Sequence, residues 1–384
     1  MDRALVFTGH FPDAKRKASI HALCEALLRQ GWTLDFVTLG HSFLSRFTPR
    51  NQWPHVAQRP VNTWVQLAPN LSSFVWRAPF HPMNLRYGLL NSIADPLYRI
   101  YPRLLPAEVF KRAEGARMVL FEGSISTMFM GMMRAMVPGA VLVYNAADRL
   151  RTVGAHPLLA RCEMQHAPIL DLVRVPAQVM TGDYPGGTRV VCIPHGIDKA
   201  ALSAEVRNPF SSPRNAISIG DMLFDAWALD VLAEAYPDWN FHIFGVGAAA
   251  RVPRKNVMVC GEKAFADLVP YLRYADIGLA PYRDSRDAIY LSQSSLKMIQ
   301  YTYCRLPILA PSFASVGRPH ACAYEPGNAA SLREAFARAI HYDRSTIPAA
   351  EVSSWDDVLE EVLQRAFLSR EQRFSDALQA GAPR

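Results

Sequence analysis

The hydrophobic positions of this chain fall into short apolar runs that are separated by amphipathic stretches. Runs typical of buried strands lie at Ala4–Thr8, Thr33–Thr38, Arg117–Phe121, Ala140–Tyr144, Gln178–Met180 and Arg189–Ile193. Between the first two, Ala18–Gln30 has the apolar spacing of a helix, and Gly31 is a typical C-terminal cap. Strands that alternate with helices in this way predict a parallel sheet covered on both faces.

The same pattern starts again in the second half of the chain. Strands are expected at Ala216–Ile219, Asn240–Phe244, Val257–Cys260, Ile277–Ala280 and Pro307–Ala310, and helices at Trp227–Tyr236, Leu268–Tyr274 and Ser331–His341. Pro194–Asp198 marks a boundary, and the polar stretch Glu205–Asn215 is typical of a linker. The fold class is therefore α/β, with two Rossmann-like doubly wound domains that face each other across a cleft. We expect domains at residues 1–204 and 205–365, then a C-terminal helix and tail at 366–384, disordered from Ala377 onward.

Bulk composition limits the class of protein. The 384 residues are half hydrophobic and one-fifth charged, as in globular proteins of two domains. No apolar run reaches 18 residues, and the N-terminus lacks the apolar core of a signal peptide, so we expect a cytoplasmic chain without a transmembrane helix. The six cysteines form no Cys-x-x-Cys pair and are expected to be reduced core residues. The net charge of +7 favours acidic partners, although a generally basic proteome explains it equally well.

An unusual segment, residues 51–106, is rich in proline, aromatic residues and arginine. Aromatic rings mixed with arginine suit the headgroup region of a membrane, and we expect this segment to contact an anionic membrane surface or a lipid-linked substrate. A sugar-stacking groove and a long loop packed on its own domain are the alternatives. No nucleic-acid-binding motif accompanies the segment, so no nucleic-acid partner is expected.

A further candidate for chemistry lies in the stretch Leu291–Ala310. A polar run, Ser292–Ser295, opens a helix, and Lys297 and Gln300 follow on one face. The free amides at a helix start attract anions, Lys297 adds a full positive charge, and Gln300 can hydrogen-bond a ribose. This end of the helix therefore offers the groups that hold a nucleoside diphosphate. The alternative is an ordinary serine cap followed by a solvated helix face.

Several short blocks occur in one order along the second half of the chain: Ile193–Asp198, Ser218–Met222, Phe241–Gly247, Val259–Glu262, Tyr274–Tyr282 and Leu296–Pro307. This ordered series resembles the donor-binding half of GT-B glycosyltransferases. Within that class the chain looks most like the bacterial xanthan-type glucuronosyltransferases, and this likeness extends into the first half through Val143–Asp148. The resemblance implies an N-terminal acceptor-binding domain and a C-terminal domain for the nucleotide-sugar donor.

The resemblance also implies an activity. Members of this group are inverting enzymes that need no metal or other cofactor. They act as peripheral proteins at the cytoplasmic face of the inner membrane, in exopolysaccharide synthesis. They move glucuronate from the donor UDP-glucuronate onto the mannose of a polyprenyl-diphosphate-linked oligosaccharide, so the expected partners are this UDP-sugar, the lipid-linked acceptor and the membrane.

Roles for individual residues follow from the same resemblance. Asp148 matches the catalytic base that accepts the acceptor hydroxyl's proton. Lys297 matches the cation that holds the diphosphate, beside the amides of Ser295 and Leu296. Gln300 stands where many GT-B enzymes carry a ribose-binding glutamate. For Asp148, the residues alone equally suggest a helix N-cap before Arg149.

Three further residues match positions near the donor. Glu262 and Tyr282 match the nucleoside pocket, and Met222 matches a residue close to the donor. Each has a simpler interpretation: a first-turn carboxylate for Glu262, packing for Tyr282 and core filling for Met222. Asp198 and Asp225 match acidic positions near the cleft, without an assigned step.

Two alternatives to this function remain at the level of sequence. One keeps the GT-B architecture but assigns another UDP-sugar donor or a nucleotide-sugar epimerase reaction. The other is a non-catalytic protein that binds a nucleotide or a glycan.

Overall fold

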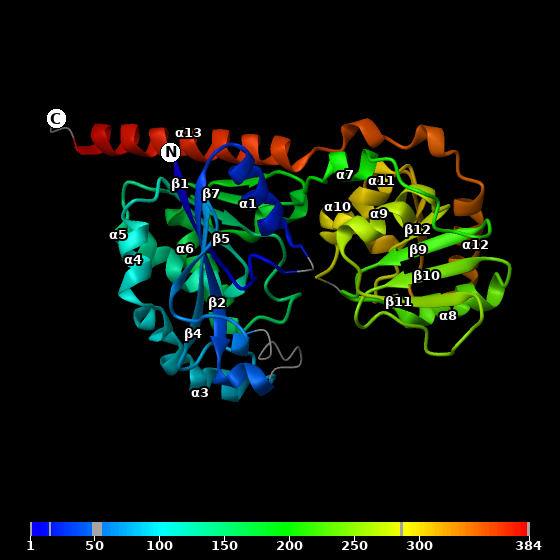
Figure 1. The fold of residues 1–384 in the computed structure, drawn as a ribbon, viewed down its shortest axis with the longest axis horizontal. Coiled ribbons are helices and arrows are strands. Elements are labelled where there is room, and N and C mark those ends of the chain that lie inside the picture. Colours follow the sequence, from blue (N-terminus) through cyan, green and yellow to red (C-terminus); the bar gives the residue numbers. More distant parts are fainter. Residues whose placement is uncertain (1, 15–16, 48–55, 285–286, 382–384) are drawn as a thin grey trace. The chain divides into compact units, whose positions relative to one another are not determined.

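The structure is a computed structural model that describes residues 2–14, 17–47, 56–284 and 287–381. Its contacts divide the chain into two compact units (Figure 1). The first unit is Met1–Ile193 together with Val358–Arg384, and the second is Pro194–Asp357.

The division between the units falls earlier than the expected boundary at residue 204. The reason is that the short helix α7 (Lys199–Ser203) packs on the second unit. Ser203 Oγ lies 2.8 Å from the Tyr303 hydroxyl, and Arg273 Nη1 donates to the Leu202 carbonyl at 2.6 Å. The C-terminal residues from Val358 join the first unit instead of forming a separate tail.

The first unit is built on one sheet flanked by helices. Its elements are β1 (Arg3–Thr8), α1 (Ser19–Arg29), β2 (Thr33–Ser42), β3 (Trp64–Ala68), β4 (Leu71–Ala78), α3 (Gly88–Arg99), α4 (Ala107–Ala113), β5 (Met118–Glu122), α5 (Met130–Met136), β6 (Val141–Asn145), α6 (Pro157–His166), β7 (Leu172–Val175) and β8 (Val190–Cys192), with 3-10 turns at Phe43–Phe47, Tyr101–Leu104, Ser124–Phe129 and Ala167–Ile169. Among the described residues the strand order is β3-β4-β2-β1-β5-β6-β7-β8. All neighbouring pairs are parallel except the β3–β4 hairpin.

The middle of this sheet is fully buried, as its apolar runs predict. Residues Ala4–Phe7 of β1 have no exposed surface, and β5 and β6 are buried along their whole length. A strand with helices on both faces needs apolar side chains on both sides, which explains the continuous runs. The strand order places β1 between β2 and β5, where the order of a doubly wound sheet reverses.

Two parts of the first unit differ from the expectation. The strand predicted at Gln178–Met180 is wrong: these residues begin a 3-10 turn, Gln178–Asp183, that Thr181 Oγ1 closes by donating to the Gln178 carbonyl at 2.8 Å. The strand beside β6 is β7 instead. Within segment 51–106, residues 56–106 form the β3–β4 hairpin at the sheet edge and helix α3, whereas 51–55 lie outside the described residues.

The second unit repeats the arrangement with a smaller sheet. Its remaining elements are β9 (Asn215–Ile219), α8 (Ala226–Ala235), β10 (Asn240–Phe244), β11 (Val257–Gly261), α9 (Phe265–Tyr274), β12 (Ile277–Leu279), α10 (Leu291–Ser294), α11 (Leu296–Tyr303), β13 (Ile308–Pro311), β14 (Ala321–Tyr324) and α12 (Ala329–Ile340), with 3-10 turns at Ser312–Ala314, Arg344–Thr346 and Ala349–Glu351. In the part of the unit that the structure describes, the parallel strand order is β11-β10-β9-β12-β13-β14.

Packing on the two faces of the second sheet is tight. On one face, Phe336 of α12 contacts the rings of Tyr236, Trp239 and Phe241 at centroid distances of 4.6–5.9 Å. On the other face, Tyr301 of α11 lies against β12 at Gly278, where an added Cβ would come within 2.4 Å of the ring. Glycine at position 278 therefore sets how closely α11 approaches the sheet.

The last helix, α13 (Trp355–Gly381), starts in the second unit and continues in the first. Its backbone is helical through 377–381, which the sequence predicts as disordered, whereas 382–384 lie outside the described residues. In the first unit, Arg373 donates to the carbonyl of Ile169 at 2.9 Å, and Arg189 donates to that of Ser369 at 2.6 Å. In the described residues, no helix combines the length and apolarity that crossing a membrane requires.

Candidate functional site

Asp148 lies just beyond the carboxyl end of β6, three residues after Asn145. Its side chain is half-buried. The alternative role as a helix N-cap is wrong, because the next helix, α6, begins at Pro157 and is capped by the His156 side chain. The strand end thus presents Asp148 on a loop, as ligand-binding residues of α/β sheets are commonly presented.

The loop after Asp148 is held by an ion pair. Arg149 donates from Nε and Nη2 to the two carboxylate oxygens of Asp183, at 2.7 and 3.0 Å. The amide of Thr152 donates to the Arg149 carbonyl at 2.9 Å and closes a turn. A two-bond arginine–carboxylate contact fixes geometry well, so the backbone on the far side of Asp148 is restrained.

A row of buried polar side chains lies next to Asp148, on strands β5, β6 and β7. Glu122, Asn145 and Arg174 are paired in register across these strands. Arg174 Nη1 donates to Asn145 Oδ1 at 2.8 Å, and Asn145 Nδ2 donates to Glu122 Oε2. Ser19, the first residue of α1, donates to the same carboxylate oxygen at 2.8 Å. All four side chains are at most 8% exposed.

Two ionisable side chains of this row, Glu122 and Arg174, have shifted pKa values because they are buried. The pKa of Glu122 is raised to about 7. Burial is the largest cause and the charge of Asp148 acts in the same direction, whereas the bonds from Ser19 and Asn145 and the charge of Arg174 lower the pKa. Burial also lowers the pKa of Arg174 to about 10. Sequence reasoning missed this row. Glu122 and Asn145 end apolar strand runs and could have been found in this way, whereas Arg174 lies inside β7.

In the second unit, the helix that was expected to open at Ser292–Ser295 is divided in two at Ser295, into α10 and α11. Ser295 is the N-cap of α11, and its Oγ accepts from the Met298 amide at 3.5 Å. It is also 2.6 Å from the Tyr282 hydroxyl. The start of α11 therefore lies at Ser295, directly before Leu296 and Lys297, where the first amides of a helix lack partners within the helix.

The ring of Tyr282 makes a cation–π contact with Lys297. The Lys297 Nζ atom lies 5.0 Å from the centroid of the Tyr282 ring, and that ring is 2% exposed. A cation over an aromatic face is stabilised by the ring's quadrupole, so the ammonium group is held near the start of α11. Lys297 and Leu296 are half-buried, and Gln300 one turn later is 8% exposed. The structure thus brings together Tyr282, Ser295, Leu296 and Lys297.

Met222 lies close to this group, because the segment after β9 pairs with the segment after β12. Phe224 forms an antiparallel bridge with Tyr282, and the Arg283 amide donates to the Leu223 carbonyl at 2.7 Å. Met222 is half-buried in that segment. Glu262 follows β11 and is exposed, next to Gly261 with its positive φ of 67°. It lies two strands from β9 in the sheet order.

Two acidic residues without an assigned step have structural roles. Asp198 caps α7, accepting from the Ala201 amide at 2.9 Å. Asp225 caps α8, accepting from the Trp227 amide at 3.0 Å. Capping by aspartate stabilises a helix by about 1 kcal/mol, which accounts for an acidic residue at both positions.

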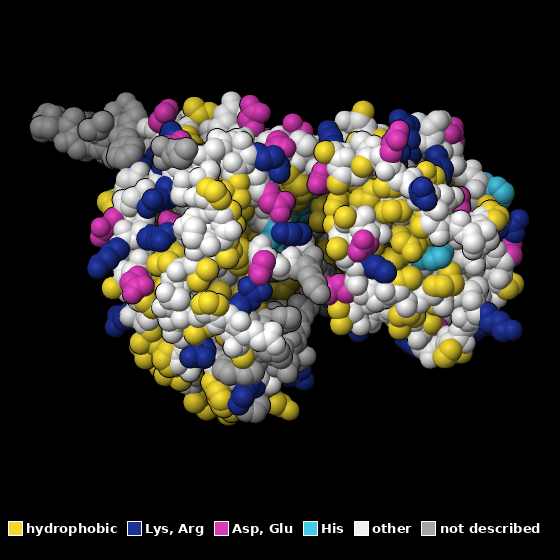
Figure 2. All heavy atoms as spheres, viewed as in Figure 1, with side chains coloured by type: hydrophobic (Ala, Val, Ile, Leu, Met, Phe, Trp, Pro, Cys, Tyr) yellow, Lys and Arg dark blue, Asp and Glu magenta, His cyan; other side chains and the backbone are white. Residues whose placement is uncertain are grey.

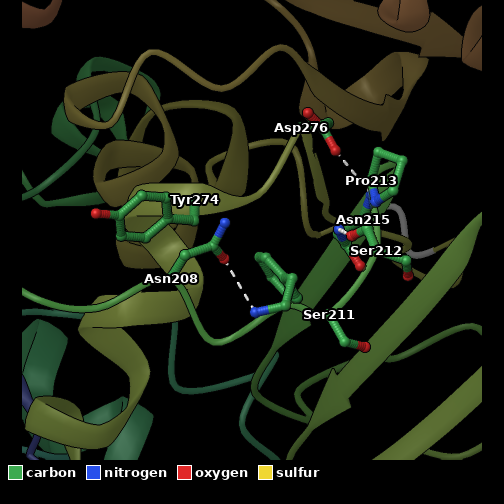
Figure 3. A pocket seen from close by; sticks show the side chains of 8 residues that line it. Asn208, Ser211, Ser212, Pro213, Asn215, Tyr274 and Asp276 are labelled. Atoms are coloured by element: carbon green, nitrogen blue, oxygen red, sulfur yellow. Dashed lines mark hydrogen bonds between the residues drawn. The ribbon is translucent and has the colours of Figure 1, made fainter.

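A pocket in the second unit lies at the amino ends of the strands and does not include the predicted donor residues. Figure 3 shows it around the start of β9, between Asn208, Ser212 and Tyr274. Its polar groups bond one another: the Asn215 amide donates to Asp276 Oδ2 at 2.8 Å, and Asn215 Nδ2 donates to the Ser212 carbonyl at 2.6 Å. This pocket lies at the amino ends of the strands and is a structural feature of the linker. In the stretches that the structure describes, no three His, Cys, Asp or Glu side chains gather as a metal site.

Comparison with known proteins bears on the fold and on the family that the chain resembles. Residues 6–176 match the family described as glucuronosyltransferase GumK, N-terminal domain. The chain is 29% identical, over 94% of its length and 88% of the relative's, to UDP-glucuronate:glycolipid 2-beta-glucuronosyltransferase of Xanthomonas campestris pv. campestris.

Solved structures resemble the whole chain at low sequence identity. A glycosyltransferase from Rickettsia africae superposes with a TM-score of 0.58 at 10% identity, covering 96% of this chain and 98% of its own. An α,α-trehalose-phosphate synthase (UDP-forming) from Burkholderia vietnamiensis superposes with a TM-score of 0.54 at 13% identity, covering 98% and 99%. These likenesses show the fold, two Rossmann-like domains of the GT-B type.

The chain is therefore a glycosyltransferase with the GT-B fold. More narrowly, it is similar to the glucuronosyltransferase GumK, and the resemblance predicted from the ordered blocks is confirmed.

Proposed function

We propose that this glycosyltransferase is an inverting, metal-independent enzyme that transfers glucuronate from UDP-glucuronate to the mannose of a polyprenyl-diphosphate-linked oligosaccharide, in exopolysaccharide synthesis. The observation that carries the proposal is the similarity over 94% of the chain to an enzyme whose name gives UDP-glucuronate as donor and a glycolipid as acceptor. The donor residues gathered at the start of α11 support it.

In the proposed reaction, Asp148 is the catalytic base. The acceptor oxygen attacks the anomeric carbon while its proton passes to the Asp148 carboxylate. The bond between the anomeric carbon and the diphosphate oxygen breaks, and UDP leaves with the electron pair. Attack from the face opposite to the leaving group converts the α-linked donor into a β-linked product.

Lys297 is the group that stabilises the leaving diphosphate. Its ammonium group is held over Tyr282, and the start of α11 adds its amides and the positive end of the helix dipole. A fixed cation beside the leaving group performs the charge stabilisation that other transferases assign to a metal ion. Gln300 binds the ribose, and Met222 and Glu262 line the donor side.

The proposed site of membrane contact is α3. Leu89, Ile93 and Leu97 are spaced one turn apart on this helix and are 75%, 67% and 50% exposed. Figure 2 shows hydrophobic side chains at the lower edge of the first unit, where Figure 1 places α3. Exposed Arg86, Arg99 and Arg103 accompany this face. An apolar face with flanking arginines suits an anionic bilayer surface and supports peripheral attachment at the cytoplasmic face of the inner membrane.

The test of function is a transfer assay with a panel of donors. Purified protein is mixed with a polyprenyl-diphosphate glycolipid ending in mannose and with UDP-glucuronate, UDP-glucose or UDP-galactose. We expect a β-linked glucuronate product from UDP-glucuronate, unchanged after EDTA treatment. Preference for another donor, or loss of activity with EDTA that added metal restores, would contradict this assignment.

The test of the base is Asp148→Asn. We expect kcat to fall by about 10²–10⁴-fold, the usual contribution of general base catalysis, while UDP binding measured by calorimetry stays the same. Asp238→Asn, which removes a surface carboxylate of the second unit that pairs with Arg214, is the matched control and should retain full activity. An Asp148→Asn enzyme with normal kcat would remove Asp148 from the mechanism.

A further inference from the structure

A histidine and a buried glutamate meet at the carboxyl ends of β1 and β5. His10 follows β1 after Gly9, and Glu122 is the last residue of β5. His10 Nε2 lies 3.9 Å from Glu122 Oε1, with the histidine side chain 46% exposed and the glutamate side chain 3% exposed. The pair therefore has an open end, the imidazole, and a buried end, the carboxyl group.

The buried end is fixed by the polar row described above. Ser19 and Asn145 both donate to Oε2 of Glu122, and Asn145 is itself held by Arg174. Because both bonds go to Oε2, they orient the carboxyl group so that its other oxygen, Oε1, faces His10. A carboxyl group that is held this firmly restrains the histidine it faces, as in triads where a third residue orients the base.

The open end is held through its backbone. The His10 amide donates to Thr8 Oγ1 at 3.3 Å, and the His10 carbonyl accepts from Thr38 Oγ1 at 2.9 Å. The ring also packs edge-on against His21, 5.5 Å away between centroids. His21 does not compete for a proton, because its Nδ1 accepts from the Ala18 amide and its Nε2 faces the Phe11 carbonyl, and burial lowers its pKa.

We propose that Glu122, His10 and Asp148 form one proton-accepting centre, in which the proton released by the acceptor hydroxyl is shared instead of resting with Asp148 alone. This inference rests on the proposed transfer. His10, which is exposed, and Asp148, which is half-buried, are the members that contact the acceptor, and Glu122 is a positioning residue. The acceptor O–H bond breaks, the new bond to the anomeric carbon forms, UDP leaves with its electron pair, and the proton stays in the centre until the product departs and water takes it.

The coupling has a physical advantage for this reaction. A single aspartate is a weak base towards an alcohol, and a second negative charge nearby raises its affinity for protons. The groups that face Glu122 are Ser19 and Cys24 from α1, Tyr144 and Asn145 from β6 and Arg174 from β7, besides Asp148 and His10. Of these, Asp148 raises the pKa of Glu122 and Arg174 lowers it, while burial is the largest influence and raises it to about 7.

Kinetics provide the first test, using Glu122→Gln and His10→Gln. Each is expected to lower kcat by at least about 10-fold with the KM for UDP-glucuronate unchanged, and to shift the acid limb of the pH–rate profile. The double variant should be no slower than the worse single variant, because the two residues act as a unit. Glu25→Gln, an exposed carboxylate of α1, and His341→Gln, an exposed histidine after α12, are the controls and should behave as wild type.

The second test does not depend on transfer. Side-chain NMR of labelled histidines follows the His10 titration in the wild type and in Glu122→Gln. We expect the midpoint to fall by at least about half a pH unit in the variant, because loss of a nearby negative charge weakens proton binding by imidazole. If the wild type transfers no glucuronate but the midpoint still falls, the proposed function fails and the coupling holds. An unchanged His10 midpoint, or wild-type kinetics in His10→Gln, would overturn the inference.

Discussion

Replacing the exposed apolar face of α3 should release the protein from membranes without harming the fold. The variant is Leu89→Ser, Ile93→Ser and Leu97→Ser together. The three side chains are 75%, 67% and 50% exposed, so they present the equivalent of about two full side chains to solvent. Transfer of one such side chain out of water contributes about 2 kcal/mol, and the triple variant should therefore lose about 4 kcal/mol of membrane affinity, or roughly a thousandfold.

The assay is sedimentation with vesicles that contain phosphatidylglycerol. Wild-type protein should pellet with the vesicles, and the triple serine variant should stay in solution while keeping its thermal unfolding temperature, because these residues lie outside the core. Replacing Val246, Val252 and Val259 with serine is a matched control, since these second-unit residues are 75%, 51% and 55% exposed. Equal pelleting of the wild type and the α3 variant would refute the argument.

Replacing the arginines beside α3 separates the apolar from the electrostatic contribution to membrane binding. Changing Arg86, Arg99 and Arg103 to glutamine removes about 1 kcal/mol each at an anionic surface, and only at low salt. The wild type should therefore bind phosphatidylglycerol vesicles less tightly as salt rises, whereas the arginine variant should show little salt dependence. The apolar and basic parts of the face are distinguished by this difference.

Three further outcomes concern stability. Burial raises the pKa of Glu163 from 4.5 to about 7, so the native state holds its proton more tightly and the free energy of unfolding should fall, by up to about 3 kcal/mol, as pH rises from about 5 to 8. Urea unfolding of Glu163→Gln, whose amide oxygen can still accept from Tyr184, should show a flatter pH dependence, and an unchanged slope would contradict this. Tyr301→Phe should cost about 1–3 kcal/mol, because the Ile219 amide loses its acceptor at 3.2 Å. Gly278→Ala should cost at least about 2 kcal/mol in calorimetric unfolding, because its Cβ overlaps the Tyr301 ring, and an equal melting temperature would show that α11 can move away.

The central strands β1, β5 and β6 were predicted correctly because each contains an unbroken apolar run. β1 has no polar residue between Ala4 and Phe7, so its sequence allows no other position than the sheet interior. β7 lacks this signal because Arg174 lies in the middle of a four-residue strand. The buried arginine donates to Asn145, a partner that lies 29 residues earlier in the chain.

The β3–β4 hairpin was missed for a related reason. β4 buries Ser72 and Ser73 next to Phe74 and Val75, so its pattern of buried positions does not alternate with polarity. Trp64 and Arg77 at the hairpin contribute to the aromatic and basic composition that suggested a surface loop. The composition of segment 51–106 indicated its exposed residues but not the residues that β4 buries.

The candidate site shows the same contrast between local and distant information. Ser295, Leu296 and Lys297 are adjacent in sequence, so one helix start predicts their grouping. His10 and Glu122 are 112 positions apart and meet only because β1 and β5 are neighbours in the sheet. Without the strand order, no spacing rule connects them.

The order in which the chain is assembled gives the C-terminal helix a role in biogenesis. The second unit is one continuous segment, Pro194–Asp357, whereas the first unit also needs residues from Val358 onward. Arg373 satisfies the carbonyl of Ile169, and Arg370 Nη1 approaches the buried Asp171 at 3.8 Å. During synthesis the second unit is therefore complete before the first, although it is translated later. A ribosome that stops before these arginines releases a protein whose first half keeps its sheet and the ion pair of Arg134 with Asp171 at 2.6 Å, but lacks the arginines that approach the second oxygen of Asp171.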